Sequence, residues 1–244
     1  MITIQKAALK AVSRFAPKND IRYYLRGVYV QATATETRLV ATDGHTMLIH
    51  RSQCENTHAW DGIIPLDTVT AILKHKSPYE KKNNHLPIEL SECGGTEGRI
   101  DYAGQAFVFK PVDGKFPDYR QIIPKDATTK ALLSVRELTT AVKRMHYFAK
   151  EVNNNLTFTL RGNEAQIATP QTQLGKDETT IVTEVVGTEG KIALSSSYLL
   201  DFLSHINSEH VELRITDSMH PAVFYIPGND RFLHLIMPLR LQES

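Results

Sequence analysis

The 244-residue chain carries the same order of predicted elements twice, once in each half. The clearest copy pairs the strand Ile64-Pro65-Leu66, which leads into a short helix, with Ile192-Ala193-Leu194, which does the same. Two strands of alternating hydrophobicity follow each copy. Self-similarity at a period near half the chain length predicts two copies of one domain, which we place at residues 1–122 and 123–244. The copies share no catalytic motif, so the repeat indicates architecture rather than chemistry.

The size and composition of the chain fit two domains that each bury a core. The chain is 41% hydrophobic, lacks an apolar run of the ~18 residues that a membrane span needs, and lacks a secretory N-terminal segment. Cys54 and Cys93 have no metal-binding spacing, so we expect reduced thiols, a cytoplasmic protein and no membrane partner. The net charge of +1 excludes a uniformly basic chain but allows basic residues to gather on one surface.

The strands between the predicted helices indicate the fold class. Segments 22–30 and 38–42 in the first half, and 156–160 and 165–168 in the second, have the composition of strands. Because several strands separate the helices, we expect an α+β fold with antiparallel sheets, not a doubly wound parallel sheet. Each repeated domain should pack two helices on its sheets.

A basic helix is predicted over residues 3–16, where Pro17 ends it. Its apolar face comprises Ile4, Ala8, Ala11, Val12 and Phe15. The opposite flank carries Lys6, Lys10 and Arg14, and the segment contains no acidic residue. Taken alone, this helix fits an ordinary solvated face as well as a binding surface.

A second basic helix is predicted in the other half of the chain. Ser134 and Glu137 form a capping box in front of it, and it runs to about Lys150. Its apolar stripe comprises Leu138, Ala141, Val142, Met145 and Ala149. The repeat-related helices therefore share an amphipathic pattern.

Cations follow the polar side of these helices. The second helix carries Arg136, Lys143 and Lys150, and Lys74 ends the shorter helix of the first half. The counterpart of that shorter helix contributes only His205, so the pattern is not uniform. Surfaces of this kind bind phosphates without reading bases, which is typical of sequence-independent DNA binding.

Five short segments of the chain carry a family resemblance. They are residues 22–25, 41–45, 113–120, 213–218 and 237–241. In order and spacing they resemble the second and third domains of the bacterial DNA polymerase III beta sliding clamp family. Each segment alone is weakly specific, but five in register over nearly the whole chain are strongly specific.

The resemblance implies a ring of six similar domains around duplex DNA, with helices inside and sheets outside. The usual subunit of that family has three domains and forms a dimer, whereas this sequence begins where the second domain begins. With two domains per chain, a six-domain ring needs three chains, which predicts a head-to-tail homotrimer. Such a chain of heterologous interfaces closes into a ring only if the rotation from one subunit to the next fits. A fragment of a longer clamp is the alternative. Met1 before a plausible first strand favours a natural short form, compatible with a phage or mobile-element origin.

The resemblance and the charge pattern together name candidate residues for DNA binding. These are Lys6, Lys10, Arg14, Asn19, Tyr23, Tyr24, Lys74, Arg136, Lys143 and Lys150. For the subunit interface the candidates are Phe107 and Phe109 on one side and Tyr147 and Phe148 on the other, because aromatic residues suit buried interface centres. Cores within each domain are the alternative for all four aromatic residues.

The resemblance also implies a pocket where polymerases attach through a short peptide. Its expected residues are Leu25, Thr42, Gly44, His45, Thr46, Met47, Pro117, Gln121, Ile122, Met219, Pro221, Leu235, Met237, Pro238, Leu239, Arg240 and Leu241. Leucine, isoleucine and methionine would line an adaptable apolar slot. The family often has arginine where this chain has Thr46 and Gln121, so its partners need not be those of a housekeeping clamp. His45 as a turn residue and Met237-Pro238 as a strand end are the structural alternatives.

The sequence favours a non-enzymatic function. Asp43 and His45 lie in a glycine turn without a nucleophile motif, the ten histidines lack metal-ligand spacing, and no nucleotide-binding loop is present. We therefore expect no metal and no cofactor, and a clamp loader that supplies ATP hydrolysis. The predicted function is a sliding clamp that encircles double-stranded DNA and tethers DNA polymerase. The alternative is a clamp-like regulator or decoy that binds replication proteins without encircling DNA.

Overall fold

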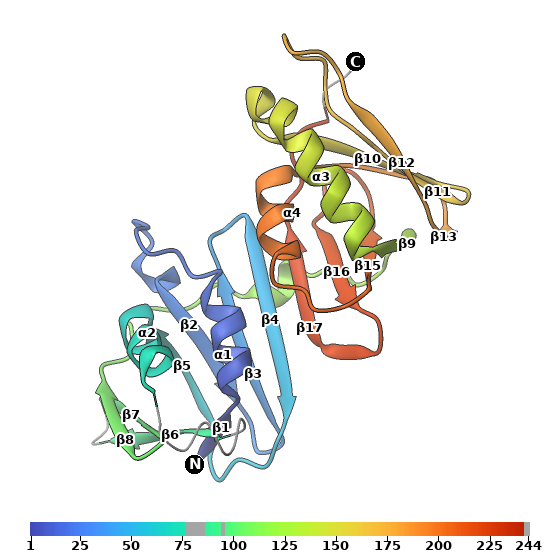
Figure 1. Cartoon of the computed structure of the whole chain (residues 1–244). Coiled ribbons are helices and arrows are strands. Elements are labelled where there is room, and N and C mark those ends of the chain that lie inside the picture. The colour runs from blue at the N-terminus through green and yellow to red at the C-terminus, as the bar shows by residue number, and fades with distance from the viewer. Residues whose placement is uncertain (77–85, 94–95, 242–244) are drawn as a thin grey trace. The chain divides into compact units, whose positions relative to one another are not determined.

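The protein is described from a computed structural model, which covers residues 1–76, 86–93 and 96–241, with the backbone alone at 92 and 93. The chain divides into two compact units, Met1–Pro117 (unit 1) and Asp118–Ser244 (unit 2), shortly before the boundary at 122 that the repeat suggested. Each unit combines helices with antiparallel sheets, as Figure 1 shows, so the predicted α+β class is confirmed.

Unit 1 contains two antiparallel sheets. The first has the order β1-β6-β7-β8, with bounds Ile2–Ile4, Ile88–Cys93, Glu97–Tyr102 and Gln105–Phe109. The second has the order β5-β2-β3-β4, with bounds Trp60–Pro65, Gly27–Ala32, Glu36–Thr42 and Thr46–Gln53. Helices α1 (Lys6–Ser13) and α2 (Leu66–Lys74) lie on the second sheet and pack together through fully buried side chains such as Leu9 and Ile72.

Unit 2 follows the same plan. One sheet has the order β12-β11-β10-β14, with bounds Glu178–Val182, Glu164–Ala168, Asn155–Arg161 and Gly190–Ser195. The other has the order β13-β9-β15-β16-β17, with bounds Val185–Gly187, Thr129–Ser134, His210–Ile215, Ala222–Ile226 and Asn229–Ile236. Helices α3 (Val135–Ala149) and α4 (Ser196–Leu203) lie side by side over a continuous hydrophobic core (Figure 1).

The first helix is shorter than its sequence pattern predicts. Residues 2–4 form β1, which pairs with β6, and the helix begins only at Lys6. Ile2 and Ile4 are both buried, as the two-residue period of a strand requires, so a start at residue 3 was wrong. The predicted apolar face also lacked Leu9, which is fully buried.

The strand predicted over residues 22–30 is also shorter. Tyr23–Leu25 form a short 3-10 helix, η1, and β2 begins at Gly27. The backbone N–H of Arg22 donates to the Asp20 carboxylate at 2.8 Å, a local side-chain bond of the type that competes with strand formation. The remaining predicted strands correspond to strands in the structure.

The long helix of unit 2 has the start and the buried stripe that the sequence predicts. The Ser134 hydroxyl accepts a hydrogen bond from the N–H of Glu137 at 3.3 Å and caps α3. The whole predicted apolar stripe, from Leu138 to Ala149, is buried. Among the helices of the described ranges, none has both the length and the apolar character to cross a membrane.

Candidate functional site

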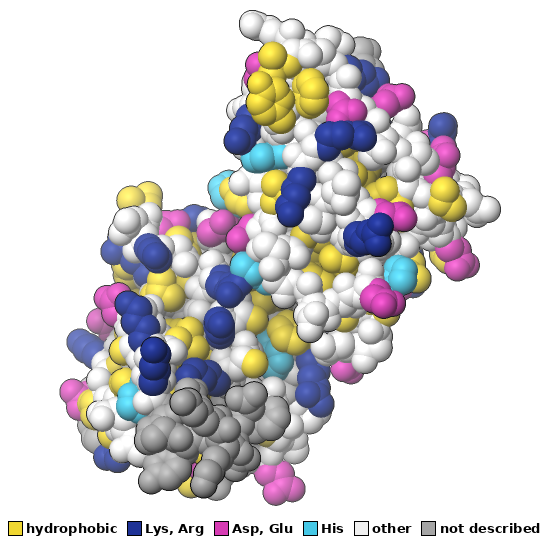
Figure 2. All heavy atoms as spheres, viewed as in Figure 1, with side chains coloured by type: hydrophobic (Ala, Val, Ile, Leu, Met, Phe, Trp, Pro, Cys, Tyr) yellow, Lys and Arg dark blue, Asp and Glu magenta, His cyan; other side chains and the backbone are white. Residues whose placement is uncertain are grey.

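Unit 1 presents cations on the solvent side of α1. Lys10 and Arg14 are exposed, while Leu9 and Val12 of the same helix are fully buried. Lys74 is exposed at the end of α2. Figure 2 shows a group of lysine and arginine side chains over these two helices. The helix geometry therefore places these charges where an anionic surface can reach them.

Lys6 differs from the other cations of α1. It is half-buried, and its Nζ donates to the Tyr102 hydroxyl at 3.1 Å and to the His75 carbonyl at 3.4 Å. The same ammonium lies 4.7 Å from the centre of the Tyr102 ring, within cation–π range. Lys6 therefore fastens α1 to β7 and is a weaker candidate for DNA binding than Lys10 or Arg14.

Unit 2 repeats the arrangement on α3. Arg136, Lys143 and Lys150 are all exposed, and Figure 2 shows cations along this helix. Arg144 is exposed as well, but its guanidinium donates to the two oxygens of Asp177 at 2.8 and 3.1 Å. An arginine paired in this way adds little to an electrostatic surface, whereas no ion pair of the predicted trio occurs among the described residues, so the trio contributes most of the positive surface of α3.

η1 and the loop before it carry the candidates for contact near the DNA. Asn19 and Tyr23 are exposed, Tyr24 is half-buried, and the two tyrosine rings meet edge to face with centres 5.7 Å apart. Ile21, which lies between Asn19 and Tyr23 in the sequence, is 94% exposed. The sequence reasoning did not select Ile21, although an isoleucine in a polar loop is a visible signal.

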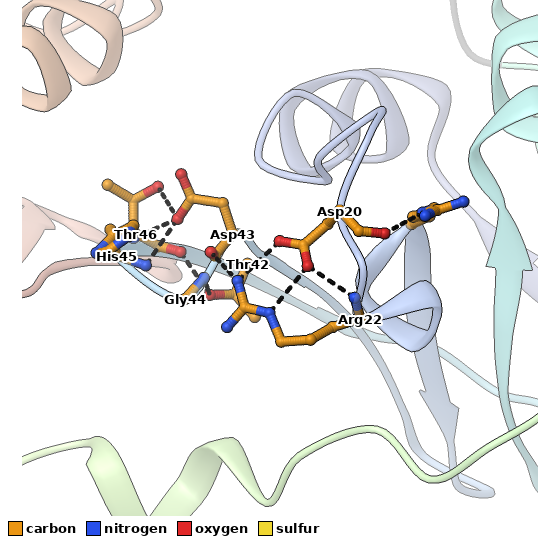
Figure 3. Close-up of polar contacts among 8 residues, drawn as sticks. Asp20, Arg22, Thr42, Asp43, Gly44, His45 and Thr46 are labelled. Atoms are coloured by element: carbon orange, nitrogen blue, oxygen red, sulfur yellow. Dashed lines mark hydrogen bonds and ion pairs between the residues drawn. The ribbon is translucent and has the colours of Figure 1, made fainter.

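The first half of the expected peptide pocket is the turn between β3 and β4, which Figure 3 shows. The Thr42 hydroxyl donates to the Thr46 carbonyl at 2.6 Å, and Asp43 Oδ1 accepts the N–H groups of His45 and Thr46 at 2.8 and 2.7 Å. Gly44 has φ +88°, a conformation that side chains with a Cβ rarely adopt. Asp43 therefore builds the turn, and His45 is exposed at its tip.

Arg22 connects this turn to the loop before η1 (Figure 3). Its guanidinium donates to both oxygens of Asp20, at 3.0 and 2.8 Å, and also to the Asp43 carbonyl at 2.8 Å. The side-chain hydrogen bonds from Arg22 to Asp20, together with the bond from the Arg22 N–H, lower the pKa of the Asp20 carboxyl to about 2. A Cβ at Gly44 would lie 2.6 Å from Arg22 Nη1. The sequence reasoning did not assign Arg22 this role, because its partner in the turn is 21 residues away.

The other pocket candidates of unit 1 differ in exposure. Leu25 and Met47 are buried, as are Thr42 and Thr46, whereas Pro117 is exposed. Threonine at 46 fits its position, because its hydroxyl contacts Asp43 Oδ1 at 3.2 Å inside the turn. The unit therefore offers a preformed turn with small polar side chains.

The second half of the expected pocket lies in unit 2. Gln121 and Ile122 are exposed in η2 (Tyr119–Ile122), and Gln121 donates to Asp118 Oδ2 at 3.0 Å. Met219 is 77% exposed, in a turn that Asp217 closes by accepting its N–H at 2.7 Å. Pro221 and Leu235 are buried, and the final segment is half-buried at Met237, Pro238, Leu239 and Leu241 and exposed at Arg240.

The comparison with known proteins identifies the family. Residues 3–118 match the family described as DNA polymerase III beta subunit, central domain, and residues 120–240 match its C-terminal domain. The chain belongs to the DNA polymerase III beta subunit family. Two similar curated proteins, both named beta sliding clamp, are from Synechocystis (25% identical) and Vibrio cholerae (27% identical). They align with 93% and 98% of this chain, which spans 61% and 65% of their length.

Solved structures of beta clamps share the fold. The Thermotoga maritima beta subunit has a TM-score of 0.89 at 23% identity, over 99% of this chain and 66% of that one. The Bacillus subtilis sliding clamp has a TM-score of 0.86 at 22% identity, over 99% and 65%. A Pseudomonas aeruginosa clamp solved with bound griselimycin has a TM-score of 0.85 at 24% identity, over 98% and 65%.

The interface candidates of this clamp-family chain fall into two groups. Phe109 is only 6% exposed, and its ring packs over Gly98, which favours the alternative of a core residue of unit 1 over a subunit-interface residue. Phe107 is half-buried against the ring of His75, with centres 5.8 Å apart. The exposed hydrophobic residue of this edge strand is Val108, at 56%. The alternation of β8 could have identified it from the sequence.

The candidates of unit 2 are more accessible. Tyr147 is 65% exposed near the end of α3, Phe148 is half-buried, and the two rings meet edge to face at 5.7 Å. Neither belongs to the buried stripe of α3. They are available for contact with another molecule, as an interface residue must be.

Titratable side chains do not assemble into a reactive centre in the residues that the structure describes. No group of three or more potential metal ligands occurs there. The Asp43 carboxylate is occupied by the N–H groups of its own turn, which leaves it poorly placed to orient His45 as a general base.

Proposed function

We propose that this chain is the subunit of a DNA sliding clamp. The observation that carries the proposal is the repeated placement of exposed cations along helices whose opposite faces are buried: Lys10 on α1 with Arg14 directly after it, and Lys143 on α3 with Lys150 directly after it. Charges on long side chains attract phosphates without fixing a register, so the protein can slide. A closed ring would keep a polymerase near its template because leaving requires the ring to open.

The assembly that fits two clamp domains per chain is a head-to-tail homotrimer. Its interface would join the β8 edge of one subunit to the α3 and β12 side of the next. Val108 and Phe107 on the first surface and Tyr147 and Phe148 on the second supply apolar and aromatic contacts, which suit interface centres. Each subunit presents two different surfaces, so the contact can close into a ring.

The candidate partner-binding surfaces in this proposal are the turn at residues 42–46 of unit 1 and, separately, the C-terminal segment 237–241 of unit 2. Exposed Met219 and half-buried Met237 can adapt to different peptides. We infer that polymerase and clamp-loader peptides bind there. Because a Pseudomonas aeruginosa clamp was solved bound to griselimycin, we choose this compound as a probe ligand, and the variants below test whether it binds at these residues. The protein would act on DNA in the cytoplasm.

Subunit stoichiometry tests the proposal. Native mass spectrometry across a range of concentrations should give three times the subunit mass, and the trimer should stay on circular DNA after loading but leave once the DNA is linearised. A chain that remains monomeric, or forms only an open dimer, at high concentration would support the regulator or decoy instead. Loss of griselimycin binding in a Met237→Ala, Leu241→Ala variant that still assembles would locate the partner site.

A further inference from the structure

Three consecutive asparagines, at positions 153 to 155, connect the segment that follows α3 to the start of β10. Asn153 and Asn154 have φ of +56° and +58°, the left-handed region that asparagine tolerates better than most side chains. The N–H of Asn154 donates to the Ala149 carbonyl at 2.7 Å, and the Asn154 carbonyl accepts the N–H of Ser196 at 2.7 Å. The tight turn therefore joins the end of α3 to the start of α4 and places Asn155 at the first position of β10.

The side chain of Asn155 points to the C-terminal segment. Asn155 is 3% exposed, and its Nδ2 donates to the main-chain carbonyl of Arg240 at 3.0 Å. A carbonyl can only accept, so the amide group must face it with its nitrogen. Within the described residues, the buried Oδ1 has no hydrogen-bond partner. A half-satisfied buried amide costs stability, so folding alone does not account for this residue.

Within the part of the chain that the structure describes, the main chain of the C-terminal segment has one other hydrogen bond after β17. Strand β17 ends at Ile236, and the segment beyond it is bound by the N–H of Leu239, which donates to the Ala193 carbonyl at 2.8 Å. The bond from Asn155 to Arg240 is the next one along the chain. These two bonds fix alternate sides of the short stretch that carries the proposed pocket residues 237–241.

We propose that Asn155 is a positioning residue for the partner pocket. It holds the backbone of Arg240, and with it the side chains of Met237 and Leu241, in the arrangement that a bound peptide meets. The inference rests on the proposed function, because it concerns the same pocket. Preorganising a segment in its bound conformation raises affinity by removing the entropy cost of ordering it.

The test replaces Asn155 with alanine in the full chain. Griselimycin affinity, measured by calorimetry, should fall about 3- to 10-fold, the equivalent of one hydrogen bond. Hydrogen exchange at the amide of Leu239 should accelerate by a similar factor, while the amides of α3 keep their protection. The matched control is Asn163→Ala, which removes an exposed asparagine from the turn between β10 and β11 and should change neither quantity.

A second variant separates lost positioning from misfolding. Asn155→Asp keeps the size of the side chain but puts an acceptor against the Arg240 carbonyl at neutral pH, so it should lose at least as much affinity as Asn155→Ala. Unchanged affinity and unchanged Leu239 exchange in both variants would overturn the positioning role. If the wild-type protein does not bind griselimycin, the proposed partner site fails, yet the exchange of Leu239 still decides whether Asn155 holds the segment.

Discussion

The two units share a plan but stabilise it by different means. Helix α3 has 15 residues, a side-chain cap from Ser134 and the acidic Glu137 in its first turn. Helix α1 has eight residues, no side-chain cap at Gln5 and no acidic residue in its first turn. Such a short helix is not stable by itself, so its buried face against the sheet and the anchor of Lys6 must hold it. The repeated fold thus depends on tertiary burial more than on local helix signals.

The candidate partner-binding surfaces of the two units differ in the same way. In unit 1 the turn is fixed by its own hydrogen bonds and by Arg22, which holds it to the neighbouring loop. In unit 2 the candidate surface comprises the exposed Met219 and a C-terminal segment held, among the described residues, by the bonds at Leu239 and Arg240. The surface of unit 1 is therefore preformed, whereas that of unit 2 is more adaptable and can fit different peptides.

Reversing the helix charges is the change with the largest expected effect. A Lys10→Glu, Arg14→Glu, Lys143→Glu, Lys150→Glu variant should lose retention on circular DNA, because attraction to phosphates becomes repulsion. The double variants of each unit show whether α1 and α3 contribute equally. The slope of log affinity against log salt concentration is negative, and each lost phosphate contact should reduce its magnitude by about 0.9. Retention is measured by gel filtration of the loaded complex.

The matched control for charge reversal lies outside the helices. Lys125→Glu with Lys191→Glu changes two exposed lysines in a loop and in β14, and it should leave retention nearly intact. If this control loses as much retention on circular DNA as the double variant of either helix, DNA binding is not specific to the helices and the proposed surface is wrong. Trimer mass must be unchanged in every variant.

A glycine in each unit compares the preformed turn with an ordinary one. Gly44→Ala forces a Cβ to within 2.6 Å of Arg22 at φ +88°, so it should strain the backbone and displace the bond to Asp43, at a cost of about 2–3 kcal/mol. Gly162→Ala, in a turn of unit 2, has φ +55° and nothing within 4 Å of the new Cβ, so about 1 kcal/mol is expected. Urea unfolding measures both.

Griselimycin binding adds a second readout to this pair. Affinity should fall in Gly44→Ala, which distorts the pocket turn, and stay at the wild-type value in Gly162→Ala. If Gly44→Ala loses the expected stability but keeps the wild-type affinity for griselimycin, the turn at 42–46 is outside the partner site.

The sequence predicted best what depends on neighbours along the chain. The start of α3 follows from Ser134 and Glu137, and its buried stripe follows from the helical period, so both could be read directly. A strand after Met1 was plausible from the sequence, but its extent to Ile4 in place of the predicted helix start could not be read, because its stability comes from pairing with β6 far along the chain. The same holds for Phe109, whose burial depends on packing over Gly98 of the neighbouring strand.

The residues of the candidate site show the same difference between local signals and contacts with segments distant in the sequence. The cations of α1 and α3 were named from periodicity and lie on exposed faces, except Lys6, whose partners Tyr102 and His75 are distant in sequence. The roles of Arg22 and Asn155 rest on single hydrogen bonds to the backbone of remote segments. Composition and period carry no signal for such bonds, so only the fold reveals them.

Acidity should affect the two units in different pH windows, the smallest of the expected effects. In unit 2, burial and then the charge of Lys150 lower the pKa of His146, whose Nδ1 lies 2.8 Å from the Ser196 hydroxyl. The unfolded chain then binds more protons than the folded one, so stability rises with pH. The contribution of His146 is complete above its unfolded pKa, near 6.5, and declines as the pH falls toward the lower folded value.

Unit 1 has no such loss from Asp20 in this range. With a pKa of about 2, the Asp20 carboxylate keeps its contribution until the pH falls below its ordinary pKa of 3.8 and toward 2. Between pH 7 and pH 5, the hydrogen-exchange protection factors, which correct for the slower intrinsic exchange at lower pH, should therefore fall more at the contact of α3 with α4 than in the loop around Arg22. His146→Gln should flatten this pH dependence, while His210→Gln, at an exposed position, should leave it unchanged. An identical pH dependence in the wild type and His146→Gln would remove His146 as the cause and, with it, this difference between the units.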